Sequence, residues 1–152
     1  MRVIFLEFDG VLHPFSATSR FAPVPPFKRA IERAWLFRWA WILDDLLEGH
    51  PDVGIVTHSN WRQLIHDDDI QSFLGPLARR FAGSTPRAPK WNSILQVVQG
   101  NSLQDFRILD ASPQAFPPGL PELIACDSEI GLREYGVQKQ IQRWLQTAHA
   151  HG

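Results

Sequence analysis

Four short and almost uninterrupted apolar runs recur along this chain and constrain its fold more than any other feature. They lie at residues 2–7, 52–59, 105–112 and 121–129, and each has the length of a β-strand. Strands that are apolar on both faces are covered on both faces, as in a parallel sheet. Because helical segments separate the runs, we predict a three-layer α/β/α, Rossmann-like core with right-handed crossovers.

Apolar spacing predicts one long helix over residues 27–48. Its apolar side chains recur every three or four positions, at Ile31, Trp35, Trp39, Ile42 and Leu46. We expect Trp35, Trp39 and Ile42 to share the face that packs on the core. Phe37 and Trp41 lie off that stripe, so either one of them is exposed on a contact surface or the helix is buried on two sides.

The other segments between the runs are shorter. Residues 11–26 contain four prolines and are predicted as a loop, which is too short to be a full cap domain. Residues 60–81 are predicted as broken helix that ends in a short strand near 80–82, followed by a loop at 83–89. Two further helices are expected, at residues 90–99 and 134–148.

Composition limits the class of protein and its partners. With 152 residues, of which 44% are hydrophobic, the chain is predicted to be a single globular domain over residues 1–152. A formal net charge of −1 argues against broad electrostatic binding to nucleic acid or lipid, and no segment is long enough to span a membrane. The single cysteine, Cys126, fits a reducing compartment, so we expect a cytoplasmic protein with a buried structural thiol.

Polar side chains gather where the predicted strands end. In chain order they are Glu7 and Asp9, Thr57 and Ser59, Asp110, and Asp127. Each residue taken alone fits a turn or a helix cap. However, the carboxyl ends of parallel strands share one edge of the sheet, where ligands bind. The shared position of these side chains therefore predicts a functional site.

The acidic members of this set suit metal-assisted phosphoryl transfer. Glu7 and Asp9 point the same way if the chain stays extended between them, and can divide the roles of nucleophile and general acid. Glu7, Asp110 and a backbone carbonyl would supply the hard oxygen ligands that suit Mg²⁺. A cation held in this way assists phosphoryl transfer by neutralising negative charge.

Groups that suit a phosphate are also present. The hydroxyl of Ser59 or Thr57 can hold a phosphoryl oxygen, and Lys90 can neutralise its charge. His58 either contacts the substrate or fills space beside Ser59. The acids of "HDDDI", at residues 66–70, are predicted to be the solvated start of a helix.

Five segments resemble motifs of the haloacid dehalogenase (HAD) superfamily. "FLEFDGVLHP" is similar to its first motif, an apolar strand followed by Asp-x-Asp-Gly, except at Glu7. "VGIVTHSNWR" resembles the second, and its Trp61-Arg62 pair is typical of HAD domains of Swiss Army Knife RNA repair proteins. "STPRAPKWNSIL" matches that branch with Lys90 as the basic residue that opens a helix. "FRILDAS" resembles the fourth motif, and "CDSEIGL" resembles the final segment of the branch.

The resemblance implies a role for each matching residue. Glu7 stands at the place of the nucleophile and metal ligand. Asp9 stands at that of the general acid/base, with its backbone carbonyl on Mg²⁺. Ser59, or Thr57 in an alternative alignment, stands at the place of the phosphate-binding hydroxyl. The remaining expected contacts are Lys90 with the nucleophile and phosphoryl group, Asp110 with the metal, and Gly10, Asn60 and Arg62 with the phosphate.

Two departures from the family pattern fall on these residues. The longer side chain of Glu7 displaces its carboxylate by up to ~1.5 Å, one carbon–carbon bond. A misplacement of roughly 1 Å can cost on the order of 10²-fold in rate. Ala111 stands where a second acid would follow Asp110. For Glu7 the sequence leaves open a natural degenerate enzyme, a relaxed site that works, or an engineered substitution that traps substrate.

The resemblance predicts a Mg²⁺-dependent phosphohydrolase with an open site for large phosphorylated substrates, among them nucleic-acid end phosphates. A second hypothesis is a non-catalytic HAD-like module that binds a phosphorylated ligand or a protein partner. A third hypothesis is a receiver domain that a kinase phosphorylates. It ranks last, because the aspartate after "FRIL" lacks its expected companions.

Overall fold

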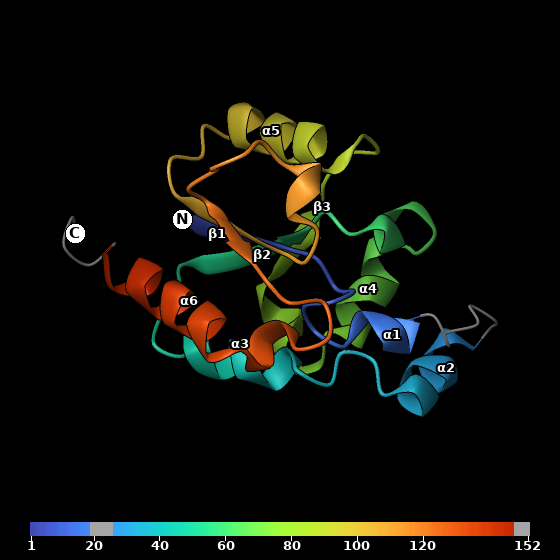
Figure 1. The fold of residues 1–152 in the computed structure, drawn as a ribbon. Coiled ribbons are helices and arrows are strands. Elements are labelled where there is room, and N and C mark those ends of the chain that lie inside the picture. Colours follow the sequence, from blue (N-terminus) through green and yellow to red (C-terminus); the bar gives the residue numbers. More distant parts are fainter. Residues whose placement is uncertain (19–25, 148–152) are drawn as a thin grey trace.

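A parallel five-stranded sheet forms the centre of the computed structural model, which describes residues 1–18 and 26–147. The strands are β1 (Arg2–Leu6), β2 (Val53–Thr57), β3 (Phe81–Ser84), β4 (Phe106–Asp110) and β5 (Leu123–Ala125). Their order across the sheet is β3-β2-β1-β4-β5, and every neighbouring pair is parallel (Figure 1). The α/β class and the four main strands are therefore confirmed, each strand being shorter than its apolar run.

Helices connect the strands. The α-helices are α1 (Phe15–Thr18), α2 (Phe27–Ala34), α3 (Ala40–Leu47), α4 (Asp67–Phe73), α5 (Lys90–Gly100) and α6 (Tyr135–Thr147). The 3₁₀ helices are η1 (Asn60–Gln63), η2 (Gly75–Arg80), η3 (Pro113–Ala115) and η4 (Gly131–Arg133). Within the described ranges, none of these helices combines the length and apolar character needed to cross a bilayer.

Alternating side chains on β1 produce the three layers. Ile4 and Leu6 lie in a large core cluster with residues of α3 and α6, whereas Val3 and Phe5 lie in a smaller cluster with residues of α5. Successive side chains of a strand point to opposite faces, so one central strand supplies both cores. Figure 1 shows α5 on one side of the sheet and α3 with α6 on the other.

The single helix predicted over residues 27–48 is wrong. α2 and α3 are separated by a break in which Trp35 and Phe37 take left-handed backbone angles, with φ of 54° and 61°. The break lets the Phe37 ring pack edge-on against Phe8 and Trp61, with ring centroids 5.2 Å and 5.3 Å away. Tertiary packing of one aromatic ring thus outweighs the helical periodicity of the sequence.

The break also redistributes the aromatic side chains. Trp39 and Ile42 are buried as expected, but Trp35, predicted in the core, is 66% exposed. Of the two residues off the stripe, Phe37 is buried and Trp41 is exposed. The helical stripe therefore predicted two of its three core residues.

The predictions for the shorter segments between the strands are mostly confirmed. The predicted loop over 11–26 contains the short helix α1, and its residues 19–25 lie outside the described ranges. The broken helix over 60–81 is confirmed as η1, α4 and η2, and the strand expected near 80–82 is β3. α5 and α6 correspond to the two later helices, with residue 148 outside the described ranges.

Candidate active site

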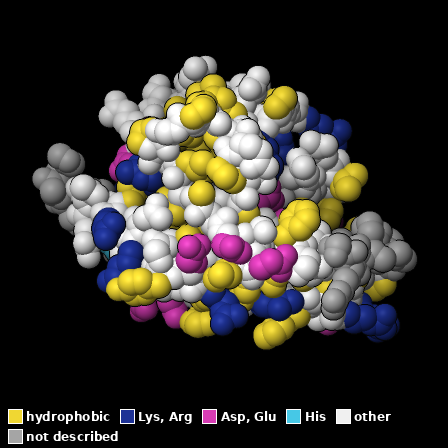
Figure 2. All heavy atoms as spheres, viewed as in Figure 1, with side chains coloured by type: hydrophobic (Ala, Val, Ile, Leu, Met, Phe, Trp, Pro, Cys, Tyr) yellow, Lys and Arg dark blue, Asp and Glu magenta, His cyan; other side chains and the backbone are white. Residues whose placement is uncertain are grey.

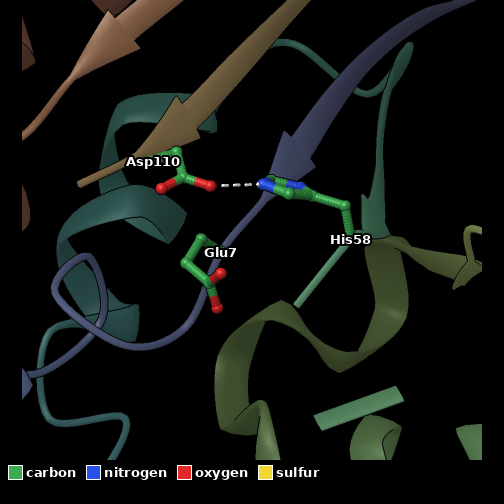
Figure 3. Close-up of side chains that lie close together, drawn as sticks. All are labelled: Glu7, His58 and Asp110. Atoms are coloured by element: carbon green, nitrogen blue, oxygen red, sulfur yellow. Dashed lines mark hydrogen bonds and ion pairs between the residues drawn. The ribbon is translucent and has the colours of Figure 1, made fainter. Parts of the chain in front are cut away.

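The carboxyl edge of the sheet brings three buried polar side chains together. Glu7 directly follows β1, His58 directly follows β2, and Asp110 is the last residue of β4. Each offers one donor atom, and these three atoms all lie within 4.8 Å of one another (Figure 3). Glu7 is 5% exposed, and the other two residues are fully buried.

Lys90 joins the two carboxylates of this group. It is the first residue of α5, and its Nζ lies 2.7 Å from Glu7 Oε2 and 3.1 Å from Asp110 Oδ2. Burial alone would lower the pKa of Lys90, but the two carboxylates raise it above its ordinary value, so the ammonium stays charged. The structure thus places Glu7, Lys90 and Asp110 together, as the sequence predicted.

Three donors fix the Asp110 carboxylate. His58 Nε2 lies 2.7 Å from Oδ2, which Lys90 also contacts, and the backbone N–H of Ser112 donates to Oδ1 at 2.7 Å. Burial alone would raise the pKa of Asp110, but the hydrogen bond and charge of His58, together with Lys90, lower it. The carboxylate is therefore ionised and has no hydrogen to give, so His58 Nε2 is the donor.

The Glu7 carboxylate is oriented by two donors. The backbone N–H of Phe8 donates to Oε1 at 2.8 Å, and Lys90 contacts Oε2. In this contact the Lys90 side chain is 17% exposed, that of Glu7 is 6% exposed and that of Asp110 is fully buried.

Asp9 belongs to a separate network. Its carboxylate accepts hydrogen bonds from His13 Nε2 at 2.9 Å, Thr18 Oγ1 at 2.7 Å and Trp61 Nε1 at 3.1 Å. Burial alone would raise the pKa of Asp9, but these hydrogen bonds lower it below its ordinary value. Among the described residues, Asp9 is not part of the three-residue donor group.

A backbone contact sets the proton on His13. The N–H of Phe37 donates to His13 Nδ1 at 3.1 Å, so Nδ1 carries no hydrogen. The ring hydrogen is then on Nε2, which donates it to Asp9. Because Phe37 lies in the break between α2 and α3, that break helps to orient Asp9.

The two candidate hydroxyls are used differently. Thr57 Oγ1 donates to the carbonyl of Leu6 at 2.8 Å and accepts from the N–H of Ser59 at 3.1 Å. Ser59 Oγ accepts from the N–H of Trp61 at 3.3 Å and caps η1, but it donates its own hydrogen to no other described residue. Of the two candidate hydroxyls, that of Ser59 is the one whose hydrogen is not donated to another described residue.

Arg62 holds two loops together. Its NH1 donates to the carbonyls of His58 and Ser59, its Nε to Pro86, and its NH2 to Ala88. The residue is 7% exposed. These carbonyls occupy four of the five guanidinium N–H groups, so the structure gives Arg62 this holding role in place of the expected phosphate contact.

Gly10 and Asn60, both expected to contact the phosphate, differ in how accessible they are to a ligand. Gly10 has a φ of 80°, and its N–H donates to the carbonyl of His13 at 3.0 Å, so the amide serves the turn rather than a phosphate. A Cβ at this position would lie 2.8 Å from the Cβ of Ala111. Asn60 is exposed at the start of η1, where a ligand can reach it.

Comparison with protein families agrees with this geometry. The model for the HAD domain in Swiss Army Knife RNA repair proteins matches residues 3–137. The chain belongs to this HAD family. No curated protein matches the chain, and no solved structure does. HAD membership makes phosphatase-type chemistry the relevant class for the site described above.

The donor atoms of this HAD domain fit a divalent cation. HAD domains generally use Mg²⁺, and the carboxylates of Glu7 and Asp110 are oxygen ligands of the kind that Mg²⁺ prefers. The two acids are buried and close together, which favours a cation between them. The imidazole of His58 adds a nitrogen donor that an all-oxygen site lacks.

Sequence reasoning missed three contacts of the HAD site. His58 was visible as a polar residue at a strand end, but a single histidine there fits a space-filling role equally well. His13 follows Asp9 by four residues in a loop, where spacing carries no structural meaning. The contact of Trp61 with Asp9 joins residues 52 positions apart, and no local pattern predicts it.

Proposed function

We propose that this HAD domain hydrolyses phosphate monoesters with the help of a divalent cation. The observation that carries the proposal is Lys90, whose ammonium bridges the carboxylates of Glu7 and Asp110 at the strand ends. A fixed cationic donor beside a nucleophilic carboxylate is arranged to bind a phosphoryl group. Glu7 and Asp110 would hold Mg²⁺, which neutralises phosphoryl charge when bound.

In this proposal Glu7 is the nucleophile and Asp9 handles the protons. A Glu7 oxygen attacks phosphorus, the bond from phosphorus to the ester oxygen breaks, and an acyl phosphate forms on Glu7. The departing oxygen takes a proton from Asp9. Water then attacks phosphorus and gives a proton to Asp9, which releases inorganic phosphate and restores Glu7. Ser59 and Lys90 hold the phosphoryl oxygens.

An exposed basic and aromatic surface supports a nucleic-acid end phosphate as the substrate. α2 exposes the basic side chains Lys28, Arg29 and Arg33. Trp35 is 66% exposed, and the Arg38 guanidinium lies 4.4 Å from the centroid of its ring. Exposed aromatic rings stack on bases, and basic side chains contact the backbone. Phe37, two residues after Trp35, contacts His13 and so connects this surface to Asp9.

The test is turnover with Mg²⁺ by the natural chain, Glu7→Asp and Glu7→Gln, on p-nitrophenyl phosphate and on 5′- and 3′-phosphorylated oligonucleotides. We expect slow turnover by the natural chain and none by Glu7→Gln. Glu7→Asp should be faster by up to about 10²-fold, because it removes the extra methylene that displaces the carboxylate, and a misplacement of roughly 1 Å costs about this much in rate. Glu48→Asp, an exposed change of the same kind, is the control. Absence of turnover in the natural chain and in Glu7→Asp would contradict the proposal.

A non-catalytic module that binds a phosphorylated ligand is the second candidate. It is favoured by the burial of Glu7 and Asp110, whose charges Lys90 already balances in part. For such a module we expect phosphorylated oligonucleotides to bind without turnover in either the natural chain or Glu7→Asp. Binding that requires the terminal phosphate separates this function from general affinity for nucleic acid.

A further inference from the structure

We infer that His58 Nε2 is a third protein ligand of the cation, and that this makes the site favour Zn²⁺ or Co²⁺ over Mg²⁺. The inference rests on the cation site of the proposed function and deepens it. It concerns which ion the site takes, and it depends on one nitrogen atom that the expected all-oxygen site did not include.

The three donors come from three neighbouring strands of the sheet. β1 lies between β2 and β4, so Glu7 lies between His58 and Asp110 along the carboxyl edge. Figure 3 shows the His58 ring directed at Asp110, with Glu7 beside the pair. Because the donor atoms already lie within 4.8 Å of one another, small side-chain adjustments suffice to place them around one ion.

The protein makes no hydrogen bond to Nδ1 of His58, the ring nitrogen that faces away from Asp110, within the described residues. His58 Nδ1 is buried and has no hydrogen-bond partner among residues 1–18 and 26–147. His13 is the contrast, since Phe37 donates to its Nδ1 and so keeps the hydrogen on Nε2. No such donor prevents His58 from carrying its hydrogen on Nδ1. Without a cation the hydrogen lies on Nε2, which donates it to Asp110; once the hydrogen moves to Nδ1, Nε2 can give its lone pair to a cation in place of that hydrogen bond.

The chemistry of the donors decides the preference. Carboxylates and water suit Mg²⁺, whereas imidazole suits Zn²⁺ and other first-row transition ions. Adding one imidazole to two carboxylates therefore raises the affinity for Zn²⁺ or Co²⁺ more than the affinity for Mg²⁺. Since most nitrogen and oxygen sites bind Zn²⁺ more tightly than Mg²⁺, the informative quantity is how far removal of the imidazole changes that ratio.

His58→Gln is the decisive variant. Its amide nitrogen can still donate to Asp110 from about the place of Nε2, so the variant keeps the hydrogen bond and removes the imidazole. Zn²⁺ and Mg²⁺ binding are measured by calorimetry on the metal-free, full-length protein without substrate, and Co²⁺ by its visible absorption. His66→Gln, the same change at an exposed position, is the control.

We expect His58→Gln to weaken Zn²⁺ and Co²⁺ binding at least about 10-fold, the lower end of what loss of even an outer partner costs. Mg²⁺ binding should change much less, and the Co²⁺ absorption should lose intensity. Equal weakening of all three ions, or no change, would overturn the inference. Turnover with Mg²⁺ alongside an unchanged Zn²⁺ to Mg²⁺ ratio would overturn it while leaving the proposed function intact.

A second measurement avoids substitution altogether. The ¹⁵N resonances of the His58 ring are followed in the natural chain as Zn²⁺ is added. We expect the Nε2 signal to move to the position of a metal-bound nitrogen, with the hydrogen on Nδ1. If Zn²⁺ binds while the Nε2 of His58 keeps its hydrogen, His58 is not a ligand.

Discussion

The Lys90 ammonium bridges two buried carboxylates, and its removal tests how far they depend on positive charge. Lys90→Met leaves Glu7 and Asp110 without that partner, and breaking a buried ion pair costs ~3–5 kcal/mol. We expect a lower melting temperature in EDTA and substantial recovery when Mg²⁺ or Mn²⁺ is added, because a ligand of the folded state stabilises it. Lys28→Met, at an exposed position, should show neither effect.

The ionised state of Asp9 predicts the pH dependence of the proposed reaction. Hydrogen bonds from His13, Thr18 and Trp61 lower the pKa of Asp9, so little of it is protonated near neutrality. Hydrolysis of an alkyl phosphate, whose leaving group needs that proton, should therefore slow as the pH rises from about 4 to 8. p-Nitrophenyl phosphate has a leaving group that needs no proton, so its kcat/KM should depend less on this step. Parallel pH profiles for both substrates would contradict this role.

The thiol of Cys126 offers a prediction without any ligand. Burial, with a smaller effect from Glu134 and Asp110, raises its pKa to about 12. The unfolded chain loses this proton near pH 8.5, so Cys126 contributes stability at lower pH that is lost as the pH rises toward 12. Thiolate absorbance at 240 nm should stay low in the folded protein up to about pH 10. It should appear near pH 8.5 in urea; the same titration in both states would disprove the shift.

The break between α2 and α3 contains two residues with left-handed backbone angles, Trp35 and Phe37, and we expect their replacement by glycine to change stability by different amounts. Trp35→Gly relieves a strain of roughly 1–2 kcal/mol at an exposed position and loses the contact with Arg38, worth ~0.5–1 kcal/mol. Phe37→Gly relieves similar strain but removes a buried ring, for which ~3–5 kcal/mol is typical. In urea unfolding we expect Trp35→Gly to be nearly neutral and Phe37→Gly to be clearly destabilised. Equal losses would show that packing of Phe37 does not maintain the break.

The sequence predicted best those elements whose formation depends on a single property, the apolar character of the segment. The four apolar runs became strands because a parallel strand must be apolar on both faces. The helix over 27–48 failed because periodicity records only which positions are apolar, and left-handed backbone angles at Trp35 and Phe37 leave no trace in it. The break is stabilised by the packing of Phe37 on Phe8 and Trp61, and both of these residues lie outside the segment 27–48.

At the scale of the whole molecule, the shared sheet edge made the candidate site partly predictable. Glu7 and Asp110 were placed together because strand ends converge in any parallel sheet, and Lys90, at the start of α5, was placed beside them by the family resemblance. The direction of a side chain was not predictable, which is why Asp9 joins a different set of donors and Arg62 serves two loops. These outcomes depend on distant backbone carbonyls and rings that sequence spacing does not describe.

Charge over the whole molecule predicts how a nucleic acid would bind. The net charge is −1, and Figure 2 shows acidic and basic side chains interspersed over the visible face, so binding should depend on the local surface of α2 and Trp35. With about three phosphate contacts, the logarithm of the affinity for single-stranded RNA should fall with log salt at a slope of about −2. Trp35→Ala should weaken binding by ~1–3 kcal/mol without changing the slope. A steep slope of about −6 would instead indicate contacts over much of the surface.

The strand order has a consequence for a nascent chain on the ribosome. β1 is made first and lies in the middle of the sheet, but one of its two neighbours, β4, ends at Asp110. Until that segment emerges, one side of β1 has unpaired amides and carbonyls, and a partly made sheet is a surface on which other chains can add. The late synthesis of β4 therefore has two effects: Phe106–Leu109 pair with the open side of β1, and Asp110 joins Glu7 and His58.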